Sequence, residues 1–161
     1  MVYTCFYRGD FSLAALVVRL DTRRPGQPFA DVPGHMAIVI GATLYEMVSG
    51  GWHSRPALPS DMVWSIEVLG LDETVATATA LSWRGTRYGW WVDALIGLSR
   101  FVPARWMSSS RGAKKHICSA FVKFILEQSG WPCPHWLAGQ DVPECPNDLW
   151  FALRKRWVSR S

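Results

Sequence analysis

Two periods of hydrophobic and polar positions run along this chain, and they predict two kinds of element. Over residues 116–129 the apolar side chains recur every three or four positions, which is the spacing of an α-helix with one buried face. Gly130 and Pro132 follow this segment. Because glycine accepts the left-handed conformation that ends many helices and proline cannot continue one, the helix should stop there. Cys118 is then predicted to lie in the first turn of a helix.

Strand-like segments precede this helix. Residues 35–41 form an apolar run of strand length, the turn at 41–43 reverses the chain, and residues 44–48 form a second strand. A third strand is predicted where the pattern alternates over residues 63–68.

The remaining segments carry weaker signals. Helices are predicted at 11–20, 72–83 and 148–158, the last capped by Asn147. Segments rich in Pro, Gly and polar residues are predicted as loops at 22–34, 49–56 and 103–115, and the apolar segment 90–102 as a helix or a lid over a groove. With no repeat and no long linker, these elements predict a single domain over residues 1–161, of the α+β class.

Composition adds limits on partners. The chain is 49% hydrophobic and 19% charged, which is typical of a globular domain. Its net charge of +4 comes from scattered basic residues, so a nucleic-acid partner is not expected, whereas an anionic polymer such as a cell wall would suit this charge. Ten tryptophans exceed what a small core needs. Contacts with a partner protein are therefore expected among the indoles of the C-terminal third: Trp131, Trp136, Trp150 and Trp157.

The beginning of the sequence bears on localisation. It lacks the charged-then-apolar layout of a signal peptide, and no apolar run reaches membrane-spanning length. We therefore expect cytoplasmic synthesis without a signal peptide and no transmembrane segment, with any export by another route.

The four cysteines contain no CxxC pair. Cys133, His135 and Cys145 have a spacing that fits no zinc pattern, so no metal is predicted, and no cofactor either. A disulfide between Cys133 and Cys145 would be open to the chain in an oxidising compartment.

The candidate chemistry combines Cys118 with the predicted strand pair. His35 opens the first strand and Glu46 lies on the second, so hairpin pairing can make their side chains neighbours on one face. A carboxylate holds a histidine in one tautomer and stabilises its protonated form. A helix N-terminus and an imidazolium both favour a thiolate. If the helix packs on the hairpin, Cys118, His35 and Glu46 are predicted as nucleophile, base and orienting carboxylate.

His53 is the second candidate for the orienting role, because it follows Glu46 closely in the sequence. Glu46 is preferred for two reasons. It lies in a predicted strand whereas His53 lies in a predicted flexible loop, and a carboxylate stabilises an imidazolium better than a neutral histidine does.

The order of these motifs resembles that of the permuted papain-like cysteine hydrolases, in the YiiX-like branch of the NlpC superfamily. The resemblance rests on short motifs that follow one another in the family's order: Gly34-His35-Met36-Ala37-Ile38-Val39, Leu44-Tyr45-Glu46, Gly85-Thr86-Arg87-Tyr88, Cys118-Ser119-Ala120-Phe121-Val122 and Pro146-Asn147-Asp148-Leu149. Two positions depart from the family's pattern. Gly34 stands where serine is frequent, and Ala120 stands where an acidic or polar residue is frequent.

The resemblance implies a small antiparallel sheet or barrel packed on the cysteine helix. It also implies hydrolysis of an amide, often in peptidoglycan peptides, through a thioacyl intermediate, with the oxyanion held by the backbone N–H of Cys118. Tyr88 is implied to line the cleft and Ser119 to bind substrate. A component of a phage tail would fit such a chain.

Two further functions stay open at this stage. Related lecithin:retinol acyltransferase-like enzymes share the order of histidine first and cysteine last, and segment 90–102 could hold an acyl chain. They tend, however, to carry a histidine where Glu46 stands. A structural tail protein with a vestigial site is the third possibility.

Overall fold

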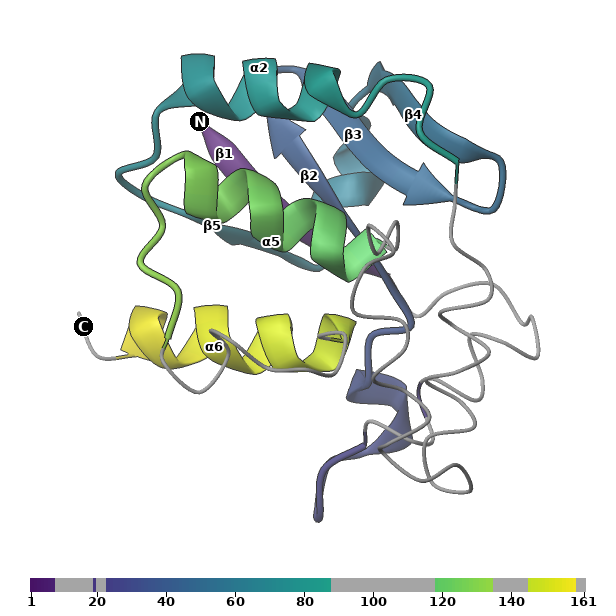
Figure 1. Ribbon diagram of the computed structural model, residues 1–161. Helices are drawn as coiled ribbons and strands as arrows, with labels where there is room; N and C mark the ends of the chain where they lie inside the picture. Colours follow the sequence, from purple (N-terminus) through teal and green to yellow (C-terminus); the bar gives the residue numbers. More distant parts are fainter. Residues whose placement is uncertain (8–18, 20–22, 88–117, 135–144, 159–161) are drawn as a thin grey trace, which may run out of the picture.

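The structure is a computed structural model, and it describes residues 1–7, 19, 23–87, 118–134 and 145–158. This part of the chain is α+β, with a five-stranded antiparallel sheet and three α-helices (Figure 1). The strands are β1 (Val2–Tyr7), β2 (His35–Ile40), β3 (Thr43–Val48), β4 (Gly51–Pro56) and β5 (Ser65–Glu67). The helices are α2 (Glu73–Ser82), α5 (Cys118–Gln128) and α6 (Pro146–Val158), with short 3₁₀ turns η1 (Phe29–Asp31) and η2 (Pro59–Met62).

The sheet has the order β4-β3-β2-β1-β5, so β1 and β2 are interior and β4 and β5 are edges among the described strands. The hairpin of β2 and β3 is centred on a tight turn in which Gly41 has φ +60°, a left-handed conformation that glycine adopts without strain. In this hairpin Ala37 lies opposite Glu46, and Ile40 lies opposite Thr43. The two predicted strands 35–41 and 44–48 are therefore confirmed, and the sheet is open where a sheet or a barrel was expected.

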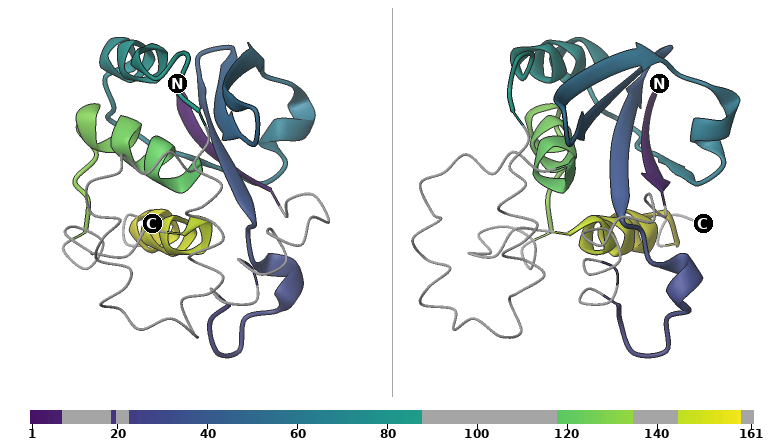
Figure 2. Two further views of the ribbon diagram at one scale, coloured as in Figure 1. Left: turned by 45° about the vertical axis from the view of Figure 1, so that its right-hand side comes forward. Right: turned by 90° about the vertical axis from the view of Figure 1, so that its right-hand side faces the viewer.

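All three helices cover one face of the sheet (Figure 2). The even-numbered residues of β2, Met36, Ile38 and Ile40, point into this core and are almost completely buried. Phe121 and Ile125 of α5 are fully buried against them. Because side chains alternate along a strand, the even-numbered residues of β2 bury one face, and the odd-numbered residues lie on the other face.

Helix α5 carries the predicted nucleophile and ends as its sequence indicates. Gly130 has φ +100°, its N–H bonds to the carbonyl of Glu127, and the N–H of Trp131 bonds to the carbonyl of Leu126. This pair of bonds is a Schellman motif, which satisfies carbonyls that the helix leaves free. Trp131 is itself buried, so it closes the core beyond the end of α5. The predicted helix is confirmed from residue 118 onward, and residues 116 and 117 lie outside the described part.

The opposite face of the sheet has a smaller apolar cluster. Cys5, Ala37, Val39 and Leu44 are buried there, and Met62 of η2 packs on them. The odd-numbered residues of β1 and β2, including Tyr7 and His35, point to this face, as do His53 and Arg55 of β4. This face therefore combines a compact apolar patch with a row of polar side chains at one end.

Two elements differ from the sequence-based expectation. No element is predicted for residues 2–7, yet β1 is an interior strand; its alternation is only six residues long. The predicted loop 49–56 is wrong, because Gly51–Pro56 forms the edge strand β4. An edge strand tolerates polar residues and a terminal proline, which is why its composition looks like that of a loop. Gly51 is required here, since a Cβ would lie 2.6 Å from the carbonyl oxygen of Thr86.

Other predicted elements were shorter or differently capped. The predicted helix 72–83 is confirmed as α2, and Asp72 caps it by accepting hydrogen bonds from the N–H groups of Thr74 and Val75. The predicted strand 63–68 is reduced to Ser65–Glu67. Asn147 does not cap α6; it lies inside the helix, and its buried amide exchanges two hydrogen bonds of 3.0 Å with the side chain of Gln27. The predictions for 11–20, 90–102 and 103–115 fall outside the described residues.

The tryptophans of the C-terminal third belong partly to the core. Trp131 is buried, and Trp150 packs edge-on against Phe6 and Trp64. Trp131 is therefore a core residue, and Trp150, which is partly buried, also packs against the core, so its role as a partner contact stays a prediction. Trp136 and the side chain of Trp157 lie outside the described part, so their role as partner contacts stays a prediction.

Cys133 and Cys145 are not joined by a disulfide in this structure. None of the described helices combines the length and the apolar character that crossing a membrane requires.

Candidate active site

The site is built at the beginning of β2. His35 is the first residue of this strand and lies opposite Tyr7 of β1, with the two rings 5.8 Å apart between centroids. The imidazole is partly buried, with 22% of its side chain exposed. Tyr7 therefore supports one side of the histidine ring and limits how it can turn.

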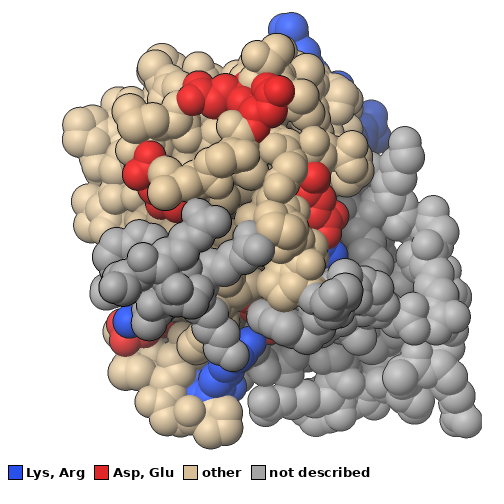
Figure 3. Space-filling view, turned by 90° about the vertical axis from the view of Figure 1, so that its left-hand side faces the viewer, with Lys and Arg blue, Asp and Glu red and all other residues tan. Residues whose placement is uncertain are grey.

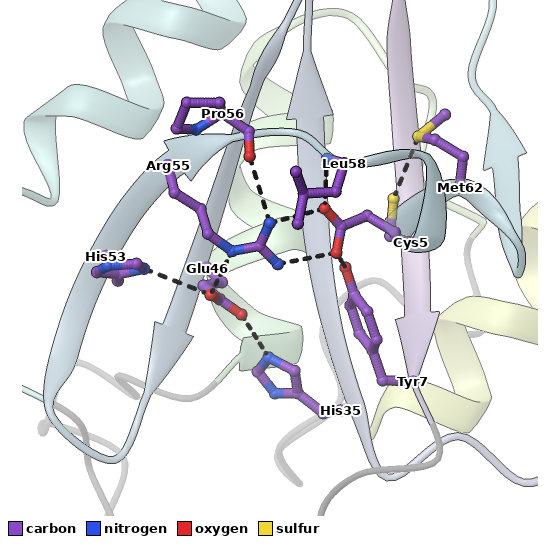
Figure 4. Close-up of polar contacts among 10 residues, drawn as sticks. Cys5, Tyr7, His35, Glu46, His53, Arg55, Pro56, Leu58 and Met62 are labelled. Atoms are coloured by element: carbon purple, nitrogen blue, oxygen red, sulfur yellow. Dashed lines mark hydrogen bonds and ion pairs between the residues drawn. The ribbon is translucent and has the colours of Figure 1, made fainter.

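Glu46 reaches the histidine from the neighbouring strand. Because Glu46 pairs with Ala37, it lies diagonally across from His35 on the same face of the sheet. Its Oε2 is 3.2 Å from Nε2 of His35 (Figure 4). The carboxylate is only 13% exposed, so this contact is shielded from water. The structure thus places Glu46 against His35, as the strand pattern predicts.

Cys118 approaches from the helix layer. It is the first residue of α5 as the structure describes it, and it is buried. Helix α5 packs along β2 and β3, which brings its N-terminal end to the start of β2. There Cys118 lies close enough to His35 for its charge to act on the imidazole. Since Nε2 of the imidazole contacts Glu46, Nδ1 is the ring atom that remains for the thiol.

The surroundings of His35 favour its protonated form. Burial alone would lower its pKa, but the charge of Cys118 and the contact with Glu46 outweigh burial and raise the pKa of His35 to about 10. The hydrogen bond from His35 in turn holds the pKa of Glu46 below its ordinary value against the opposing effect of burial, and His53 and Arg55 act in the same direction. The charges of Cys118, His35 and Glu46 therefore influence one another at the start of β2.

His53 lies beside Glu46 and not beside His35. Strand β4 places it directly opposite Glu46, with Nδ1 3.4 Å from Oε1. Strand pairing therefore fixes His53, although a flexible loop was predicted. Its side chain is about half exposed, whereas Glu46 is nearly buried. The position next to the imidazole belongs to Glu46.

A second layer of polar residues stands behind Glu46, and the sequence did not single it out. Arg55 of β4 forms a two-pronged ion pair with Asp61 of η2, with distances of 2.7 and 2.8 Å. Its Nε lies 3.9 Å from Oε1 of Glu46. Tyr7 donates a hydrogen bond from its hydroxyl to Oδ1 of Asp61 at 3.1 Å. The alternation of His53 and Arg55 could have indicated one polar face of a strand, but the loop assignment concealed it.

The two residues expected to bind substrate have different outcomes. Ser119 is completely buried in the first turn of α5, so its side chain does not reach the surface here. Its substrate-binding role stays a prediction without support from this placement. Tyr88 lies outside the described residues.

No other chemistry is evident in the described segments. They hold no cluster of three or more His, Cys, Asp or Glu side chains arranged to bind a metal ion. Figure 3 shows that the described part of one face of the molecule carries separate acidic patches and no continuous basic surface.

Comparison of the whole chain with known protein families, with curated proteins and with solved structures finds no match. What can be said of its function therefore depends on the residues of the site.

Proposed function

We propose that this chain is a cysteine hydrolase that cleaves an amide bond through a Cys118–His35–Glu46 triad. One observation supports it above all: three residues far apart in the sequence converge so that His35 contacts the Glu46 carboxylate and lies close enough to Cys118 for the charge of the thiolate to act on it. A histidine with a purely structural role can bind any two polar groups. A histidine between a cysteine at a helix start and a shielded carboxylate has the two partners that nucleophilic catalysis requires.

The reaction would proceed in two halves. The Cys118 thiolate attacks the carbonyl carbon of the substrate, a C–S bond forms, and the C–N bond breaks as the His35 imidazolium gives its proton to the leaving amine. Water then attacks the thioester while His35 accepts a proton. The C–S bond breaks, the acid product leaves, and Cys118 returns as a thiolate beside the His35 imidazolium, as at the start. Glu46 keeps the imidazole oriented and stabilises its charge in both halves.

The helix geometry suits the tetrahedral intermediates of these steps. Backbone N–H groups in the first turn of a helix have no acceptor within the helix, and they form the positive end of its dipole. The N–H of Cys118 is such a group, so it is the proposed donor to the oxyanion, together with one further donor.

The order of elements supports a permuted papain-like arrangement within the α+β fold. The histidine strand comes first, the carboxylate strand is its hairpin partner, and the cysteine helix follows and packs on both. This is the order that the resemblance to the YiiX-like branch implies. By the same resemblance we propose peptide bonds of peptidoglycan as the substrate and a phage tail as a setting in which the protein could act.

The site favours amide hydrolysis over the acyltransferase alternative. In that alternative a histidine would stand against the imidazole, but here a carboxylate occupies this position and His53 contacts only the far oxygen of Glu46. A vestigial site is also disfavoured, because an idle site has no need to keep a buried thiol, an imidazolium and a shielded carboxylate in contact.

The direct test is digestion of purified peptidoglycan, followed by mass spectrometry of the released fragments. The wild-type protein should produce fragments with new carboxyl and amino ends at one peptide bond. Cys118→Ala should abolish these products, since the nucleophile is gone, whereas Cys133→Ala should leave them unchanged because Cys133 lies outside the triad.

Circular dichroism should show the same fold for both variants. Cleavage that persists in Cys118→Ala would rule out the mechanism. Absence of cleavage by the wild type, with rapid modification of Cys118 by an acyl-type thiol probe, would keep the nucleophile and exclude this substrate.

A further inference from the structure

We propose that Arg55, anchored by the buried Asp61, is a positioning residue that holds Glu46 in the orientation in which it contacts His35. This inference rests on the proposed role of His35 and Glu46. It adds two residues, on β4 and η2, that touch neither the thiol nor any substrate.

Arg55 is held by several groups of the protein. Nη1 and Nη2 bind the two oxygens of Asp61, Nη1 also lies 3.3 Å from the carbonyl of Pro56, and Nε faces Oε1 of Glu46 (Figure 4). Both terminal nitrogens of the guanidinium therefore bind groups of the protein itself. Its contacts are all with groups that define the site.

Asp61 is a rigid anchor for Arg55. It is 4% exposed, and it accepts four hydrogen bonds, two from Arg55, one from the backbone N–H of Leu58 and one from the hydroxyl of Tyr7. A carboxylate offers about four acceptor sites, so all of them are used. The hydrogen bond from Arg55, assisted by those from Leu58 and Tyr7, outweighs burial and lowers the pKa of Asp61 to about 2. Asp61 therefore stays charged and holds Arg55 in place.

Glu46 is held at both of its carboxylate oxygens. Its two oxygens face in different directions: Oε2 toward His35, and Oε1 toward His53 and Arg55. A carboxylate held at both oxygens cannot rotate away from the imidazole. His53 is about half exposed and Arg55 is less so, which makes Arg55 the better shielded of the two groups at Oε1.

Tyr7 connects this anchor to the histidine by a second route. Its hydroxyl donates to Asp61 while its ring lies beside the imidazole of His35. Burial, followed by the negative charges of Cys5 and Asp61, raises the pKa of Tyr7, so the hydroxyl remains a donor. The groups around Glu46 thus come from four elements: Tyr7 (β1), His35 (β2), His53 and Arg55 (β4), and Asp61 (η2).

A positioning role and a simple charge effect predict opposite signs. If Arg55 were only a nearby positive charge, its removal would raise the pKa of His35 or leave it unchanged. If Arg55 orients Glu46, its removal lets the carboxylate turn away, and the pKa of His35 falls because it loses its anionic partner.

The experiment is an NMR titration of the four histidine rings in isotope-labelled protein, assigned with histidine variants. We expect Arg55→Met to lower the pKa of His35. In parallel, the rate at which iodoacetamide modifies Cys118 at neutral pH should fall about tenfold, the effect of one pK unit of lost stabilisation. Cys133, which is partly exposed, serves as the internal reference for the reagent.

Three variants sharpen the result. Arg55→Lys restores the charge but not the planar fork, so it should recover only part of the loss. Asp61→Asn should act in the same direction as Arg55→Met, because Arg55 loses its anchor. Arg84→Met, at an exposed arginine after α2, should change neither readout.

A pKa of His35 that rises in Arg55→Met would overturn the proposal, as would a lower melting temperature with both readouts unchanged. Neither readout requires a substrate. If peptidoglycan is not cleaved but Arg55→Met still lowers the pKa of His35, the positioning role stands and the proposed substrate fails.

Discussion

The two faces of the sheet perform different tasks although they share the same strands. On the helix side β2 contributes Met36, Ile38 and Ile40 to an apolar core that continues into α5 and α6. On the other side the same strand contributes His35 and Ala37, at the end of a small apolar cluster. A strand of six residues thus separates stability from chemistry by the parity of its positions.

The loss of a contact has a different effect on each of the two faces. The helix side is held by many small dispersion and hydrophobic contributions, so its loss scales with the volume removed. The polar side is held by a few directed contacts, and removing one leaves a buried charge without its partner. Substitutions on the first face should therefore reduce stability, and those on the second should reduce reactivity.

The strongest test of the polar face is Glu46→Gln. The amide keeps the size of the side chain and can still hydrogen-bond to His35, but it no longer stabilises an imidazolium. We expect hydrolysis to fall by about 10²- to 10⁴-fold, the range of general acid–base effects, with the fold retained. Steady-state kinetics of the hydrolysis of a peptidoglycan peptide would measure this loss.

The pH dependence provides the control for Glu46→Gln. Contact with His35 lowers the folded-state pKa of Glu46 below the ordinary 4.5, so its contribution to stability is present above that value and is lost as the pH falls through the folded pKa. This acid-dependent part of the unfolding free energy should be smaller in Glu46→Gln. An identical acid profile in both proteins would contradict the assigned contact.

The apolar face is tested by Phe121→Ala. Phe121 is fully buried on α5, and its ring packs edge-on against Trp83. Truncation should lower the free energy of unfolding by about 3–5 kcal/mol, because a cavity forms in a core that cannot fully collapse. Urea unfolding followed by circular dichroism would measure this.

Phe124→Ala on the same helix is the matched control. Its side chain is 40% exposed, so the loss should be clearly smaller. Equal losses for the two variants would contradict the described burial of α5.

The smallest effect is expected for His53→Ala. This histidine contacts Glu46 at 3.4 Å but is about half exposed, and Arg55 remains at the same oxygen. Activity should change by less than about threefold. A loss as large as that of Glu46→Gln would mean that His53, and not Arg55, holds the carboxylate in place.

Much of the site could be predicted because it depends on local patterns. The spacing of His35 and Glu46 around a two-strand turn determines their register, and Gly130 marks the end of the helix that carries Cys118. Both signals lie within about fifteen residues of the elements they define.

The second layer of the site could not be predicted in the same way. Arg55 and Asp61 meet only because β4 pairs at the edge of the sheet and η2 folds back across its face. Strand β4 contains glycine, proline and polar residues, and only its partner β3 makes it a strand. The interior position of β1 has the same cause, since six residues carry little periodicity until β2 and β5 pair with them.

The order of the elements along the chain determines when the site can assemble during synthesis. All the strands that the structure describes lie within the first 67 residues, whereas α5 and α6, which cover part of their apolar face, follow from residue 118 onward. During synthesis, His35 and Glu46 leave the ribosome well before Cys118 does. The nascent protein must therefore carry an incompletely covered sheet, a state prone to association, until the later helices emerge. Cys118 reaches His35 and Glu46 only when α5 docks on the sheet, so the proposed triad would be assembled late in folding and not early in synthesis.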